Sequence, residues 1–232
     1  MPVSSDPGAV EESLGGGAGG SSASTDAEGA PAEGESAAAT DTEGRAAEGA
    51  AEDSLPINEL FASLQGEGTL AGQPSTFVRT SGCNLRCWFC DSYHTSWEPT
   101  GAWMGREEIL DEVGARDPDH VVLTGGEPLI HDAAADLLRA LDDRGYHLTV
   151  ETNGTIVPPP ETPIDLASVS PKLASSTPSP DRPPAGLDPE QVTDPASDDE
   201  APSEAAIERW AEKHEADRLD VDALATLAAR YH

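Results

Sequence analysis

All three cysteines of the chain lie in one short segment, Cys83-Asn-Leu-Arg-Cys87-Trp-Phe-Cys90. Zinc sites and disulfide frameworks use even sets of cysteines or add paired histidines. Three thiolates on one loop can instead bind three irons of a four-iron, four-sulfur cube and leave the fourth iron without a protein ligand. An open position of this kind marks a catalytic metal. The CxxxCxxC spacing therefore predicts a cluster that binds a small molecule; a ferredoxin-like electron carrier and an incidental zinc site are the alternatives.

Four other polar segments are candidates for the same site. One is the glycine-containing loop Ser63-Leu-Gln-Gly-Glu-Gly68, and the others are Thr124-Gly-Gly-Glu-Pro128, Glu151-Thr-Asn-Gly154 and Ser170-Pro-Lys172. Glycine allows a backbone to come close to a ligand. Taken alone, each segment is equally well explained as an ordinary turn or as polar residues at the end of a strand. Their position relative to the cysteine loop decides between these readings.

The elements that must position these residues follow a regular alternation. Apolar, strand-like runs precede the polar segments. Segments with helical periodicity connect the first of these runs to one another. Because ligands bind at the carboxyl ends of parallel strands, we expect the polar segments to meet at one edge of the sheet. The expected strands are residues 75–79, 120–123, 147–151 and 164–169, and the expected helices are 105–115 and a segment that Asp132 caps and Gly145 ends. The predicted fold class is α/β, a partial parallel (β/α) barrel.

The remaining segments set the domain organisation. Residues 1–53 contain almost no large apolar side chain, with twelve acidic residues and one basic residue, and are predicted to be a disordered acidic tail. Residues 54–232 are predicted to form one core domain with a flexible insertion at 174–203 that is rich in Pro, Ser and Asp. Helices are expected from Ser203 to about His214 and from Asp220 to Tyr231. A further strand would be expected after the last helix, so we expect the core to be incomplete at its C-terminus.

The charge balance excludes several classes of partner. The chain has 232 residues and a formal net charge of −31, and only Lys172 and Lys213 are lysines. Such a chain is repelled by nucleic acids and by anionic membranes, so direct binding to either is not expected. Acid excess with few lysines predicts a protein adapted to high salt, where screening limits self-repulsion. The N-terminus lacks the features of a signal peptide and three free thiols suit a reducing compartment, so a cytoplasmic location is expected.

The cysteine motif, with Phe89 directly before its last cysteine, resembles that of the radical S-adenosylmethionine (SAM) enzymes. In that superfamily the open iron chelates the amino and carboxylate groups of SAM, and an electron from the cluster cleaves the sulfonium to give a 5′-deoxyadenosyl radical. The Gly125-Gly-Glu-Pro128 segment resembles the superfamily motif whose exposed backbone receives the amino group of SAM. The resemblance implies that Cys83, Cys87 and Cys90 bind the cluster. It also implies that Gly125, Gly126 and Glu127 form part of the cofactor site, to which Glu151, Ser170 and Lys172 can add contacts with the ribose or carboxylate.

A finer resemblance, over residues 57–172 and more faintly the last helix, is to the 7-carboxy-7-deazaguanine synthase family of queuosine and archaeosine biosynthesis. The residues that carry it are Leu64-Gln-Gly-Glu-Gly68, Phe77-Val-Arg79, Gly82-Cys-Asn-Leu-Arg-Cys87, Cys90-Asp-Ser92, Thr124-Gly-Gly-Glu-Pro128, Glu151-Thr-Asn-Gly154 and Ser170-Pro-Lys172.

This resemblance implies a set of substrate contacts. Leu64, Gln65 and Gly66 would contact the pterin ring with Glu67 nearby, Thr124 would also touch the substrate, and Arg79 would pair with its carboxylate through its planar fork. The family also binds Mg²⁺ through the hydroxyl that follows Cys-Asp. That residue is usually threonine and is Ser92 here, which is still a hard oxygen ligand.

The implied reaction converts 6-carboxy-5,6,7,8-tetrahydropterin to 7-carboxy-7-deazaguanine with loss of ammonia, in a homodimer supplied with electrons by a flavodoxin- or ferredoxin-type protein. No catalytic side chain is assigned, because the chemistry is that of a substrate-derived radical. Three alternatives stay open: an activating enzyme for a glycyl-radical protein, a non-catalytic iron–sulfur module, and a truncated remnant.

Overall fold

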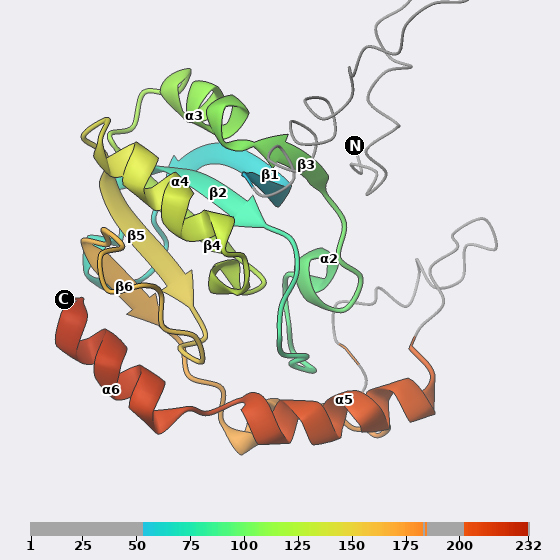
Figure 1. The fold of residues 1–232 in the computed structure, drawn as a ribbon. Coiled ribbons are helices and arrows are strands. Elements are labelled where there is room, and N and C mark those ends of the chain that lie inside the picture. Colours follow the sequence, from blue (N-terminus) through green and yellow to red (C-terminus); the bar gives the residue numbers. More distant parts are fainter. Residues whose placement is uncertain (1–52, 183, 185–201, 232) are drawn as a thin grey trace, which may run out of the picture.

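A six-stranded sheet forms the centre of the protein (Figure 1). The structure is a computed structural model that describes residues 53–182, 184 and 202–231. The strand order is β3-β1-β2-β4-β5-β6. The predicted tail at 1–53 and most of the predicted insertion at 174–203 lie outside the described residues, so both stay predictions. No helix in the described part of the chain is both long and apolar enough to cross a bilayer.

The parallel part of the sheet contains the four predicted strands, which follow one another in chain order. They are β2 (Pro74–Thr80), β4 (His120–Gly125), β5 (His147–Thr152) and β6 (Leu166–Val169). Parallel pairing joins β2 to β4, β4 to β5 and β5 to β6. All four carboxyl ends therefore point to the same edge, as in a section of a parallel (β/α) barrel, and the prediction of this fold class is confirmed.

The antiparallel part of the sheet was not predicted. The long strand β1 (Ser54–Leu64) pairs antiparallel with the whole of β2, from Ile57 opposite Thr80 to Leu64 opposite Pro74. The short strand β3 (Ala102–Gly105) pairs with the beginning of β1 and forms one edge. Leu55 and Ile57 of β1 are buried, and their contact with the core fixes this strand on the sheet. The sheet is thus mixed, with parallel strands only on the side that carries the predicted site.

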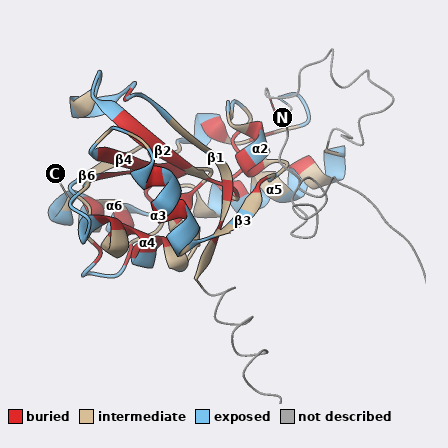
Figure 2. Ribbon diagram, turned by 90° about the horizontal axis from the view of Figure 1, so that it is seen from above, coloured by how far each residue is buried: buried red, intermediate tan, exposed pale blue. Residues whose placement is uncertain are grey.

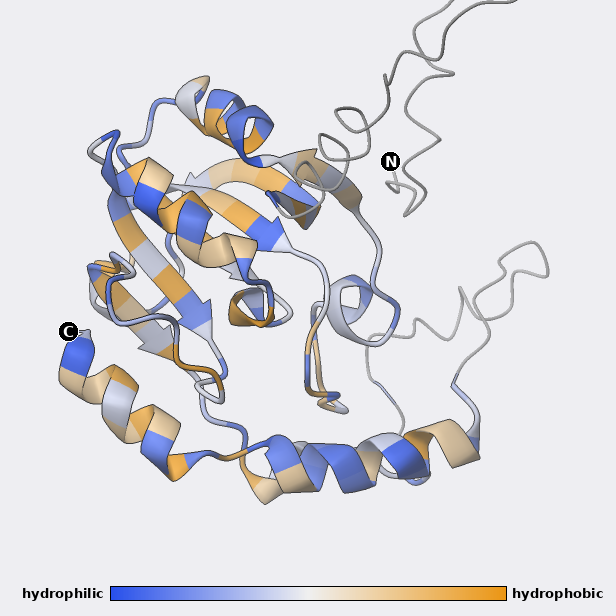
Figure 3. Ribbon diagram, viewed as in Figure 1, coloured by the Kyte–Doolittle hydropathy of each residue, from blue (hydrophilic) through white to orange (hydrophobic). Residues whose placement is uncertain are grey.

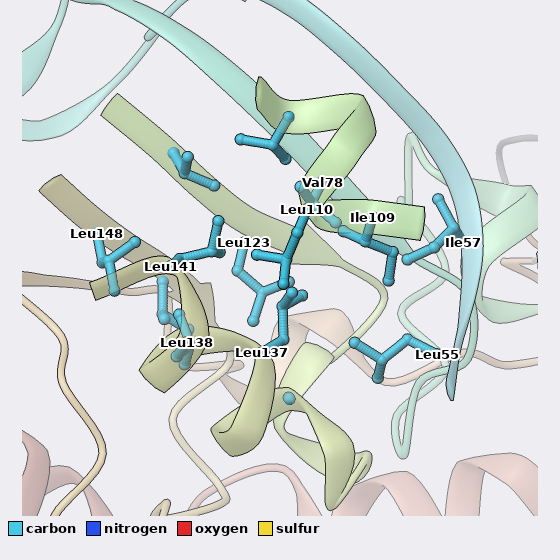
Figure 4. Packing of buried hydrophobic residues seen from close by; sticks show 14 residues of the cluster. Leu55, Ile57, Val78, Ile109, Leu110, Leu123, Leu137, Leu138, Leu141 and Leu148 are labelled. Atoms are coloured by element: carbon cyan, nitrogen blue, oxygen red, sulfur yellow. The ribbon is translucent and has the colours of Figure 1, made fainter. Parts of the chain in front are cut away.

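Two amphipathic helices cover one face of the sheet. They are α3 (Arg106–Gly114) and α4 (Ala133–Asp142), and their buried side chains meet the strands in one cluster (Figure 4). Asp132 precedes α4 as expected, but its side chain makes no capping hydrogen bond. Figure 2 shows buried residues concentrated in the strands and exposed residues on the outer sides of the helices. The core consists of Leu55, Ile57, Val78, Ile109, Leu110, Val113, Val121, Leu123, Ala134, Leu137, Leu138, Leu141, Leu148 and Val150.

Two C-terminal helices lie beyond the carboxyl ends of the strands, away from α3 and α4 (Figure 1). Helix α5 (Glu204–Asp217) begins at Ser203, whose side chain accepts a hydrogen bond from the amide of Ala206. Helix α6 (Val221–Arg230) begins at Asp220, which caps the amide of Ala223 in the same way. Short helices occupy the loops between: α2 (Tyr93–Ser96) and the 3-10 helices η2 (Gly68–Leu70), η3 (Pro128–Ile130) and η4 (Ala174–Ser176).

Candidate active site

The cysteine loop follows the carboxyl end of β2, where the hydropathy of the strands changes from hydrophobic to hydrophilic (Figure 3). All three cysteines are free thiols, and Cys87 is buried while Cys83 and Cys90 are partly exposed. They line one cavity of about 330 Å³. The wall of this cavity consists of Cys83, Leu85, Cys87, Phe89, Cys90, Asp91, Ser92, Ser96, Gly125, Gly126, Asn153 and Lys172.

The three thiols suit an iron–sulfur cluster because all of them lie in the wall of one cavity. In the described residues, no three Cys, His, Asp or Glu side chains converge on one point that could hold a metal ion. A four-iron, four-sulfur cube takes one thiolate at each of three irons, so its ligands surround a volume instead of meeting at a point. Three thiols in the wall of a cavity of about 330 Å³ are therefore a suitable donor set for a cube.

Burial governs the protonation of these thiols. It raises the pKa of Cys83 to about 12 and the pKa of Cys87 to about 11, so both are neutral at pH 7 without a metal. The positive charge of Lys172 opposes this for Cys87. Metal binding must release protons from such thiols. The Ser96 hydroxyl lies 3.2 Å from the sulfur of Cys90 and can donate a hydrogen bond to it.

Gly125 and Gly126, the first two residues of the segment Gly125-Gly-Glu-Pro128, form part of the wall of the cavity. Gly125 has a φ of +143°, which side chains disfavour, and a Cβ on Gly126 would lie 2.8 Å from the Cβ of Cys83. Both positions therefore require glycine, and the backbone of this segment packs directly on the cysteine loop.

Glu127 follows these two glycines and is fully buried. Its carboxylate accepts hydrogen bonds from the amides of Asn153 (2.7 Å) and Leu129 (3.1 Å) and from the hydroxyl of Thr152 (2.9 Å). Burial raises the pKa of Glu127, and these donors oppose that shift. Glu127 thus ties the end of β4 to the end of β5, which makes it a positioning residue for Gly125 and Gly126.

Glu151 lies outside the cysteine cavity, beside two residues that were expected to bind the substrate. Its carboxylate accepts hydrogen bonds from Gln65 Nε2 at 3.0 Å and from Thr124 Oγ1 at 2.7 Å. The Gln65 side-chain oxygen accepts the amides of Gly66 (2.7 Å) and Glu67 (3.3 Å), which closes the loop after β1. Leu64, which precedes this loop, is exposed.

Arg79 and Ser92 lie in a second cavity, of about 250 Å³, whose wall shares Asp91 and Ser92 with the first. The Arg79 guanidinium contacts Glu59 (Nε to Oε2, 3.2 Å) and the hydroxyl of Ser92 (3.3 Å). That hydroxyl in turn lies 3.3 Å from a carboxylate oxygen of Asp91. The two cavities are therefore neighbours, with Ser92 and Asp91 between them.

The last predicted residues follow β6. The Lys172 ammonium lines the first cavity and donates a hydrogen bond to Ser170 at 2.8 Å, while the Ser170 amide binds Thr152 of β5.

Two polar residues of the cavity wall, Asn153 and Ser96, had no role assigned from the sequence. Asn153 donates a hydrogen bond to Asn84 in the cysteine loop at 2.9 Å, and Ser96 contacts the Cys90 sulfur. Asn153 belongs to a quoted motif, but only the fold shows that its side chain faces the cysteines.

Known proteins with similar sequences share one superfamily and one name. The Radical SAM superfamily matches residues 77–170. A protein named 7-carboxy-7-deazaguanine synthase from Halobacterium salinarum is 60% identical over 179 residues, which are 77% of this chain and 61% of that protein. A protein of the same name from Rhodopirellula baltica is 52% identical over 129 residues, which are 56% of this chain and 49% of that protein. The crystal structure of QueE from Escherichia coli aligns with 35% identity and a TM-score of 0.46, over 52% of this chain and 60% of that one.

This chain thus spans about three fifths of the length of the Halobacterium protein and about half of the Rhodopirellula one. The Halobacterium relative supports the prediction of adaptation to high salt. With three cysteines and the Gly125–Gly126 backbone around one cavity, the chain is similar to the radical SAM superfamily over residues 77–170 and to the proteins named 7-carboxy-7-deazaguanine synthase.

Proposed function

We propose that this protein is a radical SAM lyase that converts 6-carboxy-5,6,7,8-tetrahydropterin to 7-carboxy-7-deazaguanine with release of ammonia. The observation that carries the proposal is the adjacency of two cavities. One contains the three cysteines and the Gly125–Gly126 backbone, and the other contains Arg79. Such an arrangement brings a cluster with an open iron next to a binding group for a carboxylate.

In the first cavity, Cys83, Cys87 and Cys90 bind the cluster, and the backbone of Gly125 and Gly126 accepts the amino group of SAM. Bound together, the cluster and SAM supply radical abstraction of a hydrogen atom from the substrate. The protein residues hold the reactants in place, which is the main contribution of a protein to cofactor chemistry. Lys172 brings positive charge to the cavity and can pair with the carboxylate of SAM.

In the second cavity, Arg79 binds the carboxylate of the pterin through its planar fork. The ion pair with Glu59 holds the guanidinium in place until the substrate carboxylate arrives. The Ser92 hydroxyl, between Arg79 and Asp91, provides a hard oxygen ligand for Mg²⁺, which commonly takes few protein ligands and completes its shell with substrate and water.

The pterin ring is held by the linked residues Gln65, Thr124 and Glu151. The two hydrogen bonds to the Glu151 carboxylate fix its orientation. The amides of Gly66 and Glu67 point back to the Gln65 side chain, so the loop after β1 has a defined shape. Glu151, which the sequence assigned to the SAM ribose, is better suited by this geometry to the substrate.

We also propose an electron donor, an oligomeric state and a cellular compartment for the enzyme. The cluster needs a low-potential reductant of the flavodoxin or ferredoxin class. We also propose a homodimer in the cytoplasm, where three free thiols persist.

Anaerobic reconstitution of the 232-residue chain with iron and sulfide tests the proposal. We expect a cluster whose electron paramagnetic resonance (EPR) spectrum changes when SAM is added, and formation of 7-carboxy-7-deazaguanine when the carboxylated tetrahydropterin and Mg²⁺ follow. The Cys83→Ala variant should form no cube. Preference for zinc over iron, or a cluster that does not respond to SAM, would contradict the proposal.

The same assay separates the rival functions. An activating enzyme for a glycyl-radical protein shares the cysteine and glycine motifs but has no use for a pterin-binding arginine, and it would give SAM cleavage without the deazaguanine product. An electron carrier would give a cluster signal that SAM leaves unchanged. The named relatives favour neither.

A further inference from the structure

The side chain of Arg86, the residue before Cys87, is a cation held inside the cysteine loop. Arg86 is only 8% exposed. Its Nη1 donates hydrogen bonds to the carbonyl oxygens of Cys83 (2.7 Å) and Leu85 (2.9 Å). The guanidinium also lies over the ring of Trp210, 3.9 Å from the ring centroid, where α5 crosses the tip of the loop that follows β2 (Figure 1). Two carbonyl oxygens and one aromatic face therefore fix the position of this charge.

The charge of Arg86 has no ionic partner in the described part of the chain. None of the ion pairs among the described residues includes Arg86, and its Nε is buried there without a hydrogen-bond acceptor. Burial lowers the pKa of Arg86, but a guanidinium stays protonated in proteins because its ordinary pKa is far above neutral pH. A buried charge is costly unless an opposite charge pairs with it. An anion bound at this loop would therefore be stabilised by Arg86.

A four-iron, four-sulfur cluster on the cysteine loop is an anion of this kind. The negative charges of three thiolates outweigh the positive charge of the oxidised iron–sulfur core, and reduction adds one more negative charge. Net charge is among the properties that set the reduction potential of such a cluster. A fixed positive charge beside the cluster favours the more negative, reduced state and so raises this potential.

We propose that Arg86 supplies the buried positive charge that balances the anionic cluster and raises its reduction potential. The inference rests on the proposed cluster-binding function. Arg86 acts from within the loop, whereas Lys172 lines the cavity and donates a hydrogen bond to Ser170. Because salt screens buried charges much less than exposed ones, the effect of Arg86 should persist in high salt.

Three variants separate the charge of Arg86 from its shape. Arg86→Gln removes the charge and keeps an N–H donor for the loop carbonyl oxygens. Arg86→Lys keeps the charge and loses the planar group that stacks on Trp210. Arg209→Gln is the matched control, because it makes the same change of charge at an exposed neighbour of Trp210 on α5.

The first measurement is the midpoint potential of the reconstituted cluster in high salt. We expect a shift to lower potential in Arg86→Gln, a potential close to that of the wild type in Arg86→Lys, and no shift in Arg209→Gln. A role in loop structure alone would shift Arg86→Gln and Arg86→Lys equally, since both lose the stacked guanidinium.

The second measurement is urea unfolding, with and without the cluster. In the cluster-free protein the thiols of Cys83 and Cys87 are neutral, so the charge of Arg86 opposes folding. Cluster-free Arg86→Gln should therefore be at least as stable as the cluster-free wild type. Cluster binding should stabilise the wild type and Arg209→Gln more than Arg86→Gln. A folded Arg86→Gln chain that binds no cube, beside an Arg86→Lys chain that does, would also support the inference.

Equal potentials in the wild type and Arg86→Gln, or equal shifts in Arg86→Gln and Arg86→Lys, would overturn the inference and leave the proposed function intact. A cluster-free Arg86→Gln chain that is less stable than the wild type, or that does not fold, would also overturn it. If the wild-type chain takes up no cluster, the proposed function fails together with this inference.

Discussion

At the scale of single residues, the site depends on charged and polar groups that are already paired within the protein. Arg79 contacts Glu59 and Ser92, and Glu151 is bound by Gln65 and Thr124. Pairing of this kind holds each group in one orientation before a ligand arrives, which lowers the entropy lost on binding. Substitutions that keep the charge but change the shape of the group are therefore informative.

Arg79→Lys keeps the positive charge and loses the planar fork that matches a carboxylate. We expect the KM for the carboxylated tetrahydropterin to rise about tenfold, equivalent to about 1.4 kcal/mol. Cluster assembly and SAM cleavage without substrate should be unchanged. Arg139→Lys, in an exposed pair with Asp136, is the control and should have no effect. An unchanged pterin affinity in Arg79→Lys would remove Arg79 from the substrate site.

Ser92→Ala removes the hydroxyl that we assign to Mg²⁺. The Mg²⁺ concentration needed for half-maximal product formation should rise about tenfold. Loss of a group around a metal site typically lowers metal affinity by about 10- to 100-fold, and we expect the lower value. Ser92→Thr restores a hydroxyl and should behave as the wild type. If Ser92→Ala shows the wild-type Mg²⁺ dependence, the ion binds elsewhere.

At the scale of elements, the strands are joined at their amino ends by a buried histidine. The ring of His120, at the start of β4, lies 2.7 Å from the Ser75 hydroxyl of β2 and 2.8 Å from the Thr149 hydroxyl of β5. Burial lowers the pKa of His120, and the neighbouring His147 lowers it further. This contact links the two strands on either side of β4.

The free energy of unfolding should therefore fall as the pH drops below about 6.5, the ordinary pKa of histidine. The unfolded chain binds a proton on His120 at a higher pH than the folded chain does, so protonation favours unfolding. Urea unfolding in high salt at pH 8 and at pH 5.5 measures this loss. The loss of unfolding free energy between the two pH values should be smaller in His120→Gln, a variant that we expect to be less stable at pH 8. It should be unchanged in His94→Gln, because His94 is exposed. Equal losses in the two variants would contradict the assignment to His120.

Helix α4 contributes to stability through its apolar face. Leu137 is fully buried in the core cluster, so Leu137→Ala should lower the free energy of unfolding by about 2–5 kcal/mol. The exposed neighbour Asp142 gives a control, Asp142→Ala, with an expected change within about 0.5 kcal/mol. Urea unfolding at constant pH and salt compares the two. A loss of less than about 1 kcal/mol for Leu137→Ala would mean that the site collapses around the missing side chain.

At the scale of the whole molecule, the net charge of −31 governs how stability depends on salt. Repulsion among surface carboxylates opposes the compact state, and salt reduces it because the Debye length falls from about 10 Å at 0.1 M to about 3 Å at 1 M. The melting temperature should rise steeply with potassium chloride from 0.1 M to 2 M and the protein should unfold readily at the low end. Full stability at 0.1 M salt would contradict adaptation to high salt.

The predicted parts of the fold were those with a local signal. The four parallel strands and the helices after Gly105 and Asp132 have periodic apolar patterns, and each was found close to its expected bounds. Strands β1 and β3 were missed because their pairing is decided by contact with β2 and with each other and not by their own residues. The capping bond expected of Asp132 does not form, because Asp132 has a helical backbone conformation.

The sequence by itself determined the chemistry: three thiols at CxxxCxxC spacing, the glycine-rich segment after β4 and the arginine at the end of β2. These are local patterns whose residue types limit what they can bind. Only the tertiary structure decided which side chains meet. It brought Glu151 to Gln65 instead of to the cysteine cavity, turned Asn153 toward the cysteine loop, and placed His214 against the Arg86 amide. Contacts between residues far apart in the chain depend on the packing of whole elements, and no local pattern encodes them.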